Sequence, residues 1–378
     1  QIVLSSLGPV VQDGSNLRLS PGSVQVYLQG ETPSCWQRVE VLGPDAGLYF
    51  PNQTTLRDMD GDGDLDVFVP AGFFVCTFDT AVRTCGALSW LENKGVGQPW
   101  PRHDVLTLRE RAFYHQVGFA DLDGDGVDDL VTIAETTSDP RAVWFRGTTE
   151  GSRFEAIPRD IGPGGGSLPT LFDVDGDGDM DVLSAQYFAA DHSFVWFEQQ
   201  ERPSAAAPAG RWARHALNSD SGKGFHIQVV PDLLGDGKPV AVATNHTNRT
   251  SNPDDAESAV LVLAPSGDVR APWQKTTVSE GIVSRPTVGS RIMGAPGVFG
   301  YGDIDGDGDV DLAVAGDGDA RTFWMEQTTP GRFVMHTVEE AMGQAAGAKV
   351  YDVDGDGRRD LVFVGYEANV LYVYRNIQ

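Results

Sequence analysis

Apolar residues alternate with polar ones in short stretches along the chain, a pattern typical of half-buried β-strands. One stretch leads into each of several acidic segments and a second leaves it, as at residues 117–120 and 130–133. A third stretch carries aromatic residues, and a fourth follows a turn. Four strands per unit, repeated about every fifty to seventy residues, predict the blades of a β-propeller. The aromatic stretches begin at Trp90, Trp144, Trp196, Phe323 and Tyr372.

The two ends of the chain indicate how many blades to expect. After the last acidic segment only a second and a third strand follow, whereas residues 23–28 and 36–41 match third and fourth strands. We therefore expect residues 2–7 to complete the last blade, and the stretch after them to form a first blade without a metal. This predicts a single all-β domain over residues 1–378, a seven-bladed β-propeller of four-stranded antiparallel blades. Six blades are the alternative, if the opening segment is too short to form one.

A nine-residue acidic loop connects the first two strands of the repeating unit. Carboxylates stand at loop positions 1, 3, 5 and 9, and glycines at positions 4 and 6. This spacing suits a hard cation, and the glycines allow a positive φ where the chain doubles back. A plain Asp-Gly turn would not need acids at all four positions, and their mutual repulsion is unfavourable unless a cation offsets it. Intact copies begin at Asp58, Asp121, Asp173, Asp303 and Asp352.

The EF-hand shares the first half of this pattern but not the second. An EF-hand needs a bidentate Glu at position 12 and a helix on each side. Strand-like residues follow each loop instead, and none of the side chains at position 12 binds calcium. We therefore expect cation loops that join two β-strands. Position 12 is occupied by Val69, Thr132, Ser184, Val314 and Phe363.

These repeats resemble the FG-GAP/VCBS repeats of integrin α-subunit β-propellers and their bacterial and fungal relatives. The segment from Phe299 to Gly308 is a good local example, because it joins a Phe-Gly element to an acidic loop. The resemblance covers most of the chain and implies about five structural Ca²⁺ ions, each bound by four carboxylates and the main-chain carbonyl at position 7. An incomplete copy has Leu234 at position 3, Lys238 at position 7 and Val240 at position 9, so no calcium is expected there.

The resemblance assigns the ligands loop by loop. They are Asp58, Asp60, Asp62 and Asp66 with the carbonyl of Asp64; Asp121, Asp123, Asp125 and Asp129 with that of Val127; Asp173, Asp175, Asp177 and Asp181 with that of Asp179; Asp303, Asp305, Asp307 and Asp311 with that of Asp309; and Asp352, Asp354, Asp356 and Asp360 with that of Arg358.

Charge and cysteine content limit which partners the protein is expected to bind and which cellular compartment it is expected to occupy. A formal net charge of -26 weighs against binding to nucleic acid or to an anionic membrane surface. No apolar run approaches the ~20 residues of a membrane-spanning helix, so no membrane insertion is expected. Cys76 and Cys85 flank a short turn and could form a hairpin disulfide, with Cys35 left over. Together with the calcium loops, this predicts an extracellular or cell-surface, secreted protein.

The function expected from these features is non-enzymatic: an integrin-like propeller that mediates adhesion by binding a protein or glycan on one loop face. The insertions at residues 244–257 and 281–297, and the turn at 76–85, are the expected docking loops. The alternative is a carbohydrate-active enzyme of the lyase or dehydratase type, or its accessory module. Such an enzyme should place paired acids or a Lys/Tyr/His cluster in one cleft, whereas the acids of this sequence gather in the loops.

Overall fold

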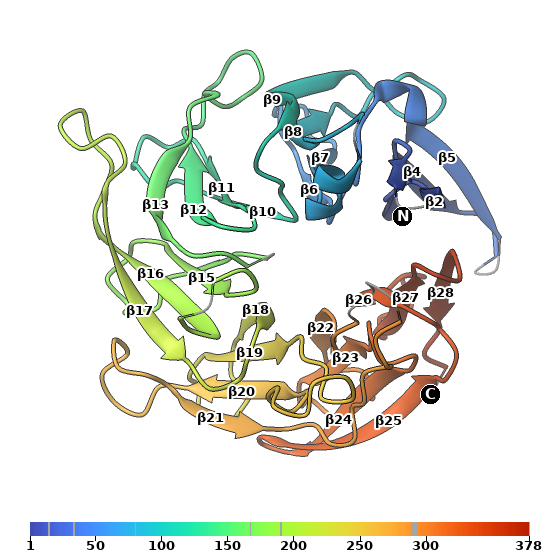
Figure 1. Cartoon of the computed structure of the whole chain (residues 1–378), viewed down its shortest axis with the longest axis vertical. Helices are drawn as coiled ribbons and strands as arrows, with labels where there is room; N and C mark the ends of the chain where they lie inside the picture. Colours follow the sequence, from blue (N-terminus) through green and yellow to red (C-terminus); the bar gives the residue numbers. More distant parts are fainter. Residues whose placement is uncertain are drawn as a thin grey trace. The chain divides into compact units, whose positions relative to one another are not determined.

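The computed structural model consists almost entirely of β-strands joined by turns (Figure 1). It describes residues 1–13, 16–32, 35–79, 81–166, 168–189, 191–288 and 293–377. Two short 3-10 helices, η1 (Pro44–Ala46) and η2 (Phe74–Phe78), are the helical elements of the described chain. The strands are β1 (Ile2–Ser6), β2 (Val10–Asp13), β3 (Asn16–Leu19), β4 (Ser23–Gln29), β5 (Trp36–Leu42), β6 (Thr55–Arg57), β7 (Asp66–Ala71), β8 (Gly86–Leu91), β9 (Arg102–Glu110), β10 (Val117–Ala120), β11 (Asp129–Ala134), β12 (Arg141–Phe145), β13 (Arg159–Pro163), β14 (Thr170–Phe172), β15 (Asp181–Ala185), β16 (Phe194–Glu201), β17 (Arg211–Asn218), β18 (Gly224–Val230), β19 (Val240–Asn245), β20 (Val260–Ala264), β21 (Gln274–Thr277), β22 (Phe299–Gly302), β23 (Asp311–Ala315), β24 (Thr322–Thr329), β25 (Arg332–Glu339), β26 (Ala345–Tyr351), β27 (Asp360–Gly365) and β28 (Val370–Tyr374).

Seven antiparallel sheets follow one another along the described chain, and each is built from strands close in sequence. Five sheets have four strands in the orders β6–β9, β10–β13, β14–β17, β18–β21 and β22–β25. The first sheet, β1-β4-β5, and the last, β26–β28, have three strands each, and β2 and β3 form a separate hairpin. The chain is therefore an all-β, seven-bladed propeller, as the sequence predicts, and the six-bladed alternative is wrong.

The N-terminal strand does not take the predicted place. We expected residues 2–7 to complete the last blade, but β1 pairs with β4 in the first sheet, with Ile2 opposite Tyr27 and Ser6 opposite Ser23. The prediction that every blade has four strands is likewise wrong for the first and last sheets. The physical reason is loop closure. Pairing β1 with β4 closes a short loop, whereas pairing it with the last sheet would join residues at opposite ends of the chain, which costs more entropy.

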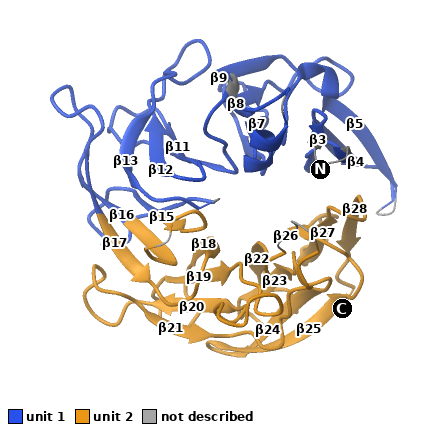
Figure 2. Cartoon of the chain, viewed as in Figure 1, with its two compact units in different colours: residues 1–182, 197–213 blue, residues 183–196, 214–378 orange. Residues whose placement is uncertain are grey.

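The chain divides into two compact units (Figure 2). Unit 1 comprises residues 1–182 and 197–213, and unit 2 comprises residues 183–196 and 214–378. The acidic loops that start at Asp58, Asp121 and Asp173 lie in unit 1, and those that start at Asp303 and Asp352 lie in unit 2. The single domain over residues 1–378 stays a prediction.

The core of each unit lies between the faces of neighbouring sheets. In unit 1, Phe68 and Trp90 pack with Leu130 and Phe145 of the next sheet. In unit 2, Val242 and Val260 belong to one cluster with residues of β23 and β24, such as Leu312, Phe323 and Met325. Second and third strands such as β7, β8, β11 and β15 are buried along almost their whole length, which is why they carry apolar residues on both faces. The aromatic third-strand residues Trp90, Trp144, Trp196 and Phe323 are therefore core, whereas Tyr372 of the last sheet is 40% exposed.

The recurring histidine of the fourth strand packs on the third-strand tryptophan. The ring centroids of Trp90 and His103 lie 4.1 Å apart, and those of Trp324 and His336 lie 4.8 Å apart. His103 also contacts the carboxylate of Glu92 at 2.9 Å. This arrangement fixes the outer edge of the sheet and gives these histidines a packing role.

Candidate functional site

Each intact acidic loop joins the first and second strands of its sheet, as predicted. The loops from Asp121 and Asp303 connect β10 to β11 and β22 to β23. The glycines at positions 4 and 6 have positive φ in every copy, for example 82° at Gly306 and 95° at Gly308. A side chain with a Cβ would strain these turns, which is why glycine occupies them.

The loops bring carboxylates from positions 1 and 3 together in all five copies. In each copy a third carboxylate, from position 5 or position 9, joins them, so that three ligand oxygens lie within 4.8 Å of one another. The groups are Asp58, Asp60 and Asp62; Asp121, Asp123 and Asp129; Asp173, Asp175 and Asp181; Asp303, Asp305 and Asp311; and Asp352, Asp354 and Asp356. The predicted carboxylate ligands that stand outside these groups are Asp66, Asp125, Asp177, Asp307 and Asp360.

The position-1 aspartate also organises the turn. Its Oδ1 accepts a hydrogen bond from the N–H of the position-4 glycine at 2.7–2.8 Å. Its Oδ2 accepts one from the position-6 glycine at 2.8–3.2 Å. The N–H of position 7 donates to the position-5 carboxylate at 2.8–2.9 Å, which places Asp64, Val127, Asp179, Asp309 and Arg358 at the predicted point of the loop.

The position-9 aspartate is the buried member of each loop and joins it to the third strand. One oxygen accepts from the N–H of position 2 at 2.8–3.0 Å. The other accepts at 2.7–2.9 Å from a main-chain N–H at the end of the third strand. Burial raises the pKa of Asp129 to about 6 and that of Asp181 to about 7, against the hydrogen bonds that lower it. A bound cation would favour the charged form of these carboxylates.

The incomplete loop lacks both the position-9 carboxylate and the main-chain N–H that would donate to it. Its position 9 is Val240, which has no carboxylate. The register of β19 and β20, in which Ala241 pairs with Leu263, places Pro265 where the other sheets have the N–H donor. Proline has no N–H, so the acceptor and its donor are absent together. Gly237 still donates to Asp232 at 2.6 Å, but Asp232 has a φ of 52° and Gly235 donates to its main-chain carbonyl, so the turn differs in shape from the intact loops.

The donor set fits a calcium ion. Aspartate oxygens from alternate loop positions converge with a main-chain turn, and hard oxygen ligands of this kind suit Ca²⁺ rather than a softer transition metal. Four carboxylates per loop give enough negative charge to balance a divalent ion. The identity and number of the ions stay predictions, because the geometry establishes the clustering of the carboxylates alone.

A second polar cluster lies in unit 2, at the other ends of the second strands. In successive sheets, one residue stands six positions beyond loop position 9, just past the end of the second strand. These residues are Tyr187, His246, Asp317 and Tyr366. A strand rises about 3.3 Å per residue, so this position lies roughly 20 Å from the start of the strand. The cluster is therefore separate from the acidic loops.

His246 and Asp317 form the centre of this cluster. His246 Nε2 lies 3.0 Å from Asp317 Oδ2, and the two side chains are only 10% and 9% exposed. Asp317 has a φ of 52°, unusual for a residue other than glycine and frequent at functional sites. The second oxygen of Asp317 accepts from Gln344 Nε2 at 2.9 Å. These contacts hold the carboxylate against the imidazole and place the ring proton on Nε2.

Aromatic and basic residues surround the imidazole. The Tyr187 ring centroid lies 5.5 Å from that of His246, and the Phe225 ring stacks on His246 at 4.6 Å. Lys223 Nζ lies 5.1 Å from the Tyr187 ring centroid. A Cβ added at Gly294 would come within 2.4 Å of His246 Nδ1, so that backbone segment fixes the ring from the other side.

The two long insertions meet beside this cluster. Thr247 bridges to Ala295, and Asn248 Nδ2 donates to the carbonyls of Arg285 and Met293. Arg285 in turn pairs with Glu367 at 2.9 Å. The predicted docking loops at 244–257 and 281–297 therefore contribute His246 and Arg285; residues 289–292 of the second lie outside the described residues.

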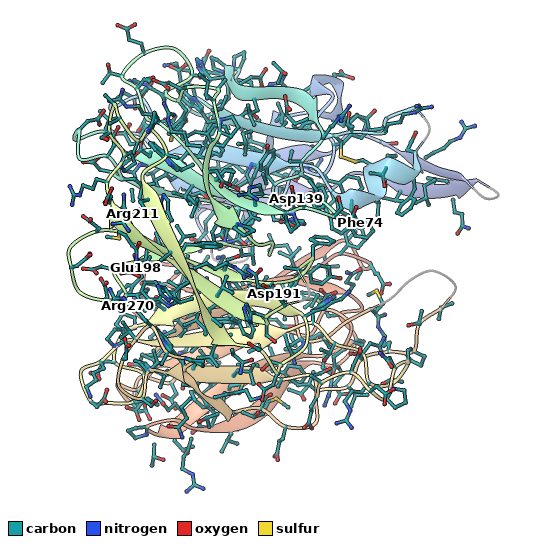
Figure 3. All side chains as sticks on the ribbon, turned by 60° about the vertical axis from the view of Figure 1, so that its left-hand side comes forward. Phe74, Asp139, Asp191, Glu198, Arg211 and Arg270 are labelled. Atoms are coloured by element: carbon teal, nitrogen blue, oxygen red, sulfur yellow. A yellow bond between two sulfur atoms is a disulfide. The ribbon has the colours of Figure 1, made fainter. Side chains whose placement is uncertain are left out.

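Further acid–base contacts lie in both units. In unit 1, His115 Nδ1 lies 2.6 Å from Oε1 of Glu135, which is fully buried and stands six residues beyond position 9 of its loop. In unit 2, Arg214 pairs with Asp191, which is labelled in Figure 3. The sequence interpretation included His246 and Arg285 only as parts of the expected docking loops and singled out none of these residues as a site residue. The recurring offset of six residues from the last loop aspartate was the available signal, since it selects Glu135, Tyr187, His246 and Asp317.

Comparisons with known proteins agree with the architecture. The FG-GAP-like repeat matches residues 121–184 and 303–363, so the chain contains FG-GAP-like repeats, and the predicted resemblance is confirmed. No curated protein matches the sequence. No described helix is long and apolar enough to cross a membrane.

Solved structures similar to this chain include enzymes of carbohydrate metabolism. An α-L-arabinanase from Penicillium chrysogenum, solved with arabinobiose, has 14% identity and a TM-score of 0.48, over 86% of this chain and 92% of that one. The polysaccharide lyase Uly1 has 10% identity and a TM-score of 0.42, over 95% and 85%. A thermostable family-43 glycoside hydrolase has 12% identity and a TM-score of 0.38, over 77% and 97%.

These comparisons correct the expected function. The expectation of a non-enzymatic, integrin-like adhesion module was wrong, because the similar solved structures are glycoside hydrolases and a polysaccharide lyase. The sequence pointed to adhesion because the acidic loops were its strongest signal, and those loops are shared by proteins of different function. At 10–14% identity the likeness concerns the fold, so the chemistry of this chain depends on its own side chains.

Proposed function

We propose that this chain is a carbohydrate-active enzyme of the lyase or dehydratase type, with structural Ca²⁺ in its acidic loops. The observation that carries the proposal is the contact series in unit 2 from Tyr187 through His246 to Asp317. Three second strands deliver these side chains to one place, with Lys223 beside them. Structural stability alone does not require a phenol, an imidazole–carboxylate pair and an ammonium group together.

Elimination from a sugar needs this combination of groups. A base removes the proton on the carbon next to a carboxyl or carbonyl group, and a cation stabilises the enolate that forms. The bond from the neighbouring carbon to its oxygen then breaks, and an acid protonates the leaving oxygen. Tyr187 and His246 supply the two proton-transferring groups, and Asp317 holds the imidazole in place. A glycosidic leaving oxygen makes the reaction a lyase, and a hydroxyl makes it a dehydratase.

An exposed lysine favours an acidic sugar as the substrate. Lys223 is exposed beside Tyr187, whereas the guanidinium of Arg285 is paired with Glu367. In a protein of net charge -26, an exposed ammonium group beside this phenol is a specific feature. The carboxylate of a uronate residue would be neutralised there, which lowers the energy of the enolate. A glycan is therefore the partner that we propose.

Calcium has a supporting role in this proposal. The carboxylates at positions 1, 3, 5 and 9 and the position-7 carbonyl would hold the ion. When bound, it would supply charge compensation that ties the first, second and third strands together. The loops lie at the opposite ends of the second strands from Tyr187 and His246, so the ion would take no part in the reaction. A catalytic metal also needs an open coordination position.

We also propose that the protein works outside the cytosol. Cys76 and Cys85 are joined by a disulfide that pins η2. Disulfides persist in oxidising compartments, and extracellular fluid supplies the calcium that weak sites need. Export is consistent with a polysaccharide substrate.

The test is an assay of the purified, calcium-loaded protein on a panel of acidic and neutral polysaccharides. We expect new ultraviolet absorbance from the conjugated double bond that elimination leaves. Tyr187→Phe and His246→Asn should each lower kcat about 10²- to 10⁴-fold, the usual contribution of a proton-transferring group. Tyr372→Phe is the matched control, because Tyr372 lies on β28 and makes its ring contact with Tyr374.

Two results would overturn the proposal. Full turnover in both Tyr187→Phe and His246→Asn would show that the reaction takes place elsewhere. Release of reducing ends without ultraviolet absorbance would identify a hydrolase. Melting curves of each variant separate a catalytic loss from a folding defect, since Asp317 and Phe225 also contact His246.

A further inference from the structure

One register position beside the acidic loops changes charge from sheet to sheet. It is the residue in or just past the third strand that immediately precedes the N–H donor to the position-9 aspartate. Three sheets have a glutamate there and two have an arginine. In chain order the residues are Glu92, Arg146, Glu198, Glu326 and Arg375.

In the loop that starts at Asp121, the arginine contacts two predicted calcium ligands. Arg146 Nε lies 2.8 Å from Asp123 Oδ2, and its Nη2 lies 2.7 Å from Asp125 Oδ2. These are the position-3 and position-5 carboxylates. The guanidinium thus bridges two predicted ligands, and its hydrogen bonds, one to each carboxylate, are charge-assisted.

The loop that starts at Asp352 has the same feature. Arg375 Nε lies 2.5 Å from Oδ2 of Asp354, the position-3 carboxylate. A second guanidinium, from Arg358 at position 7, pairs with Asp356 at position 5. Two positive charges therefore contact the ligand set of this loop.

The three remaining loops have a glutamate at this register position, although in the loop that starts at Asp173 an arginine further along, Arg202, pairs with the position-7 side chain of Asp179. Glu326 contacts His336 at 2.6 Å, and Glu92 contacts His103 at 2.9 Å, so the fourth strand fixes both carboxylates beside their loops. Lys94 pairs with Glu92, and its Nζ lies 4.0 Å from Asp60 Oδ2. In the loop that starts at Asp58, the ammonium group of Lys94 is therefore shared between the predicted ligand Asp60 and the carboxylate of Glu92.

We propose that the five loops form two classes of Ca²⁺ site, set by this one residue. The loops from Asp58, Asp173 and Asp303 fill at lower calcium concentration. The loops from Asp121 and Asp352 fill later, because Arg146 and Arg375 compete with the ion for the same carboxylates. Exchanging arginine for glutamate changes the local charge by two units beside a divalent ion. We expect a roughly 10- to 100-fold change in Kd, after screening by salt.

The experiment is a calorimetric titration of the calcium-depleted, full chain with Ca²⁺. The wild type should show three tighter and two weaker sites. Arg146→Glu should move one site into the tighter class, and Arg146→Gln should give an intermediate Kd. Glu326→Arg should move one site in the opposite direction. Arg146 is 41% exposed, so these substitutions should leave the fold intact, which a melting curve verifies.

Arg38→Glu is the matched control. It makes the same charge change on β5, in the first sheet, which carries no acidic loop. It should leave both classes unchanged. Five equal sites in the wild type, or two weaker sites that persist in Arg146→Glu, would overturn the inference. Crystals grown at limiting calcium add an independent readout: ions should occupy the glutamate loops first, and equal occupancy of all five would count against two classes.

Discussion

Replacing the buried aspartate of one loop should show how much the loop contributes to stability. Asp311 is fully buried, and its two oxygens accept main-chain hydrogen bonds from Ile304 at 3.0 Å and from Gln327 at 2.7 Å. The first bond closes the loop, and the second joins β23 to the end of β24. Asp311→Ala removes both acceptors and leaves two N–H groups without them in the interior.

The magnitude follows from these contacts. A buried N–H without a partner costs about 1–3 kcal/mol, so two cost about 2–6 kcal/mol. Burial raises the pKa of Asp311, which means that desolvation of the charged carboxylate already offsets part of its benefit. We therefore expect Asp311→Ala to lower the free energy of unfolding by about 2–4 kcal/mol in EDTA. In calcium the loss should be larger by the binding free energy of one ion, about 2.7 kcal/mol at 100 times Kd.

The assay is urea unfolding followed by tryptophan fluorescence, with and without calcium. Asp309→Ala is the matched control: it has the same residue type in the same loop, but position 7 acts through its main chain. It should cost under about 1 kcal/mol, the usual range for a surface substitution. Equal losses for the two variants, or a loss for Asp311→Ala that appears in calcium alone, would refute the idea that the carboxylate is a main-chain acceptor in its own right.

Four further outcomes are expected. Chelation with EDTA should lower the melting temperature by several degrees, and an unchanged melt would contradict bound calcium. Val240→Asp should destabilise the protein by about 1–3 kcal/mol, because Pro265 has no N–H for the new carboxylate; a stabilised variant would contradict this. Burial lowers the pKa of His226 to about 3, so folding favours the neutral imidazole. The contribution of His226 to the free energy of unfolding is therefore complete above pH 6.5, and below that pH it is lost by about 1.4 kcal/mol per pH unit. His226→Leu should show a shallower decline in unfolding free energy between pH 6 and pH 4, and parallel profiles would argue against it. Cys76→Ser with Cys85→Ser should cost about 2–3 kcal/mol, the entropy of a short closed loop, and an unchanged urea midpoint would argue against that.

The local elements were predictable because their causes are local. Short apolar stretches fix the strands, although the second and third strands are buried on both faces and not alternately as expected, and the glycines at positions 4 and 6 fix the loop turns. Both could therefore be read from a few neighbouring residues. The number of blades followed from counting repeats. The pairing of β1 did not follow, because any apolar strand at the N-terminus is compatible with either the first or the last sheet. Only the competing closure entropies decide between them.

The candidate catalytic cluster was out of reach for a similar reason. Tyr187, His246 and Asp317 are far apart in sequence, and none belongs to a local motif. They come together because each stands at the same register position of a different sheet, just past the end of the second strand. A periodic search at that offset would have found them, whereas a search for short catalytic motifs could not.

By itself, then, the sequence determined the strand pattern, the number of repeats and the acidic loops, since these depend on interactions between residues close in the chain. Tertiary structure decided three other matters. It paired Asp311 with Gln327, placed Arg146 on Asp123 and Asp125, and brought His246 to Asp317. Each of these contacts joins residues from segments that are separated in the chain, and its energy depends on distance in space and on burial, neither of which is encoded by spacing along the chain.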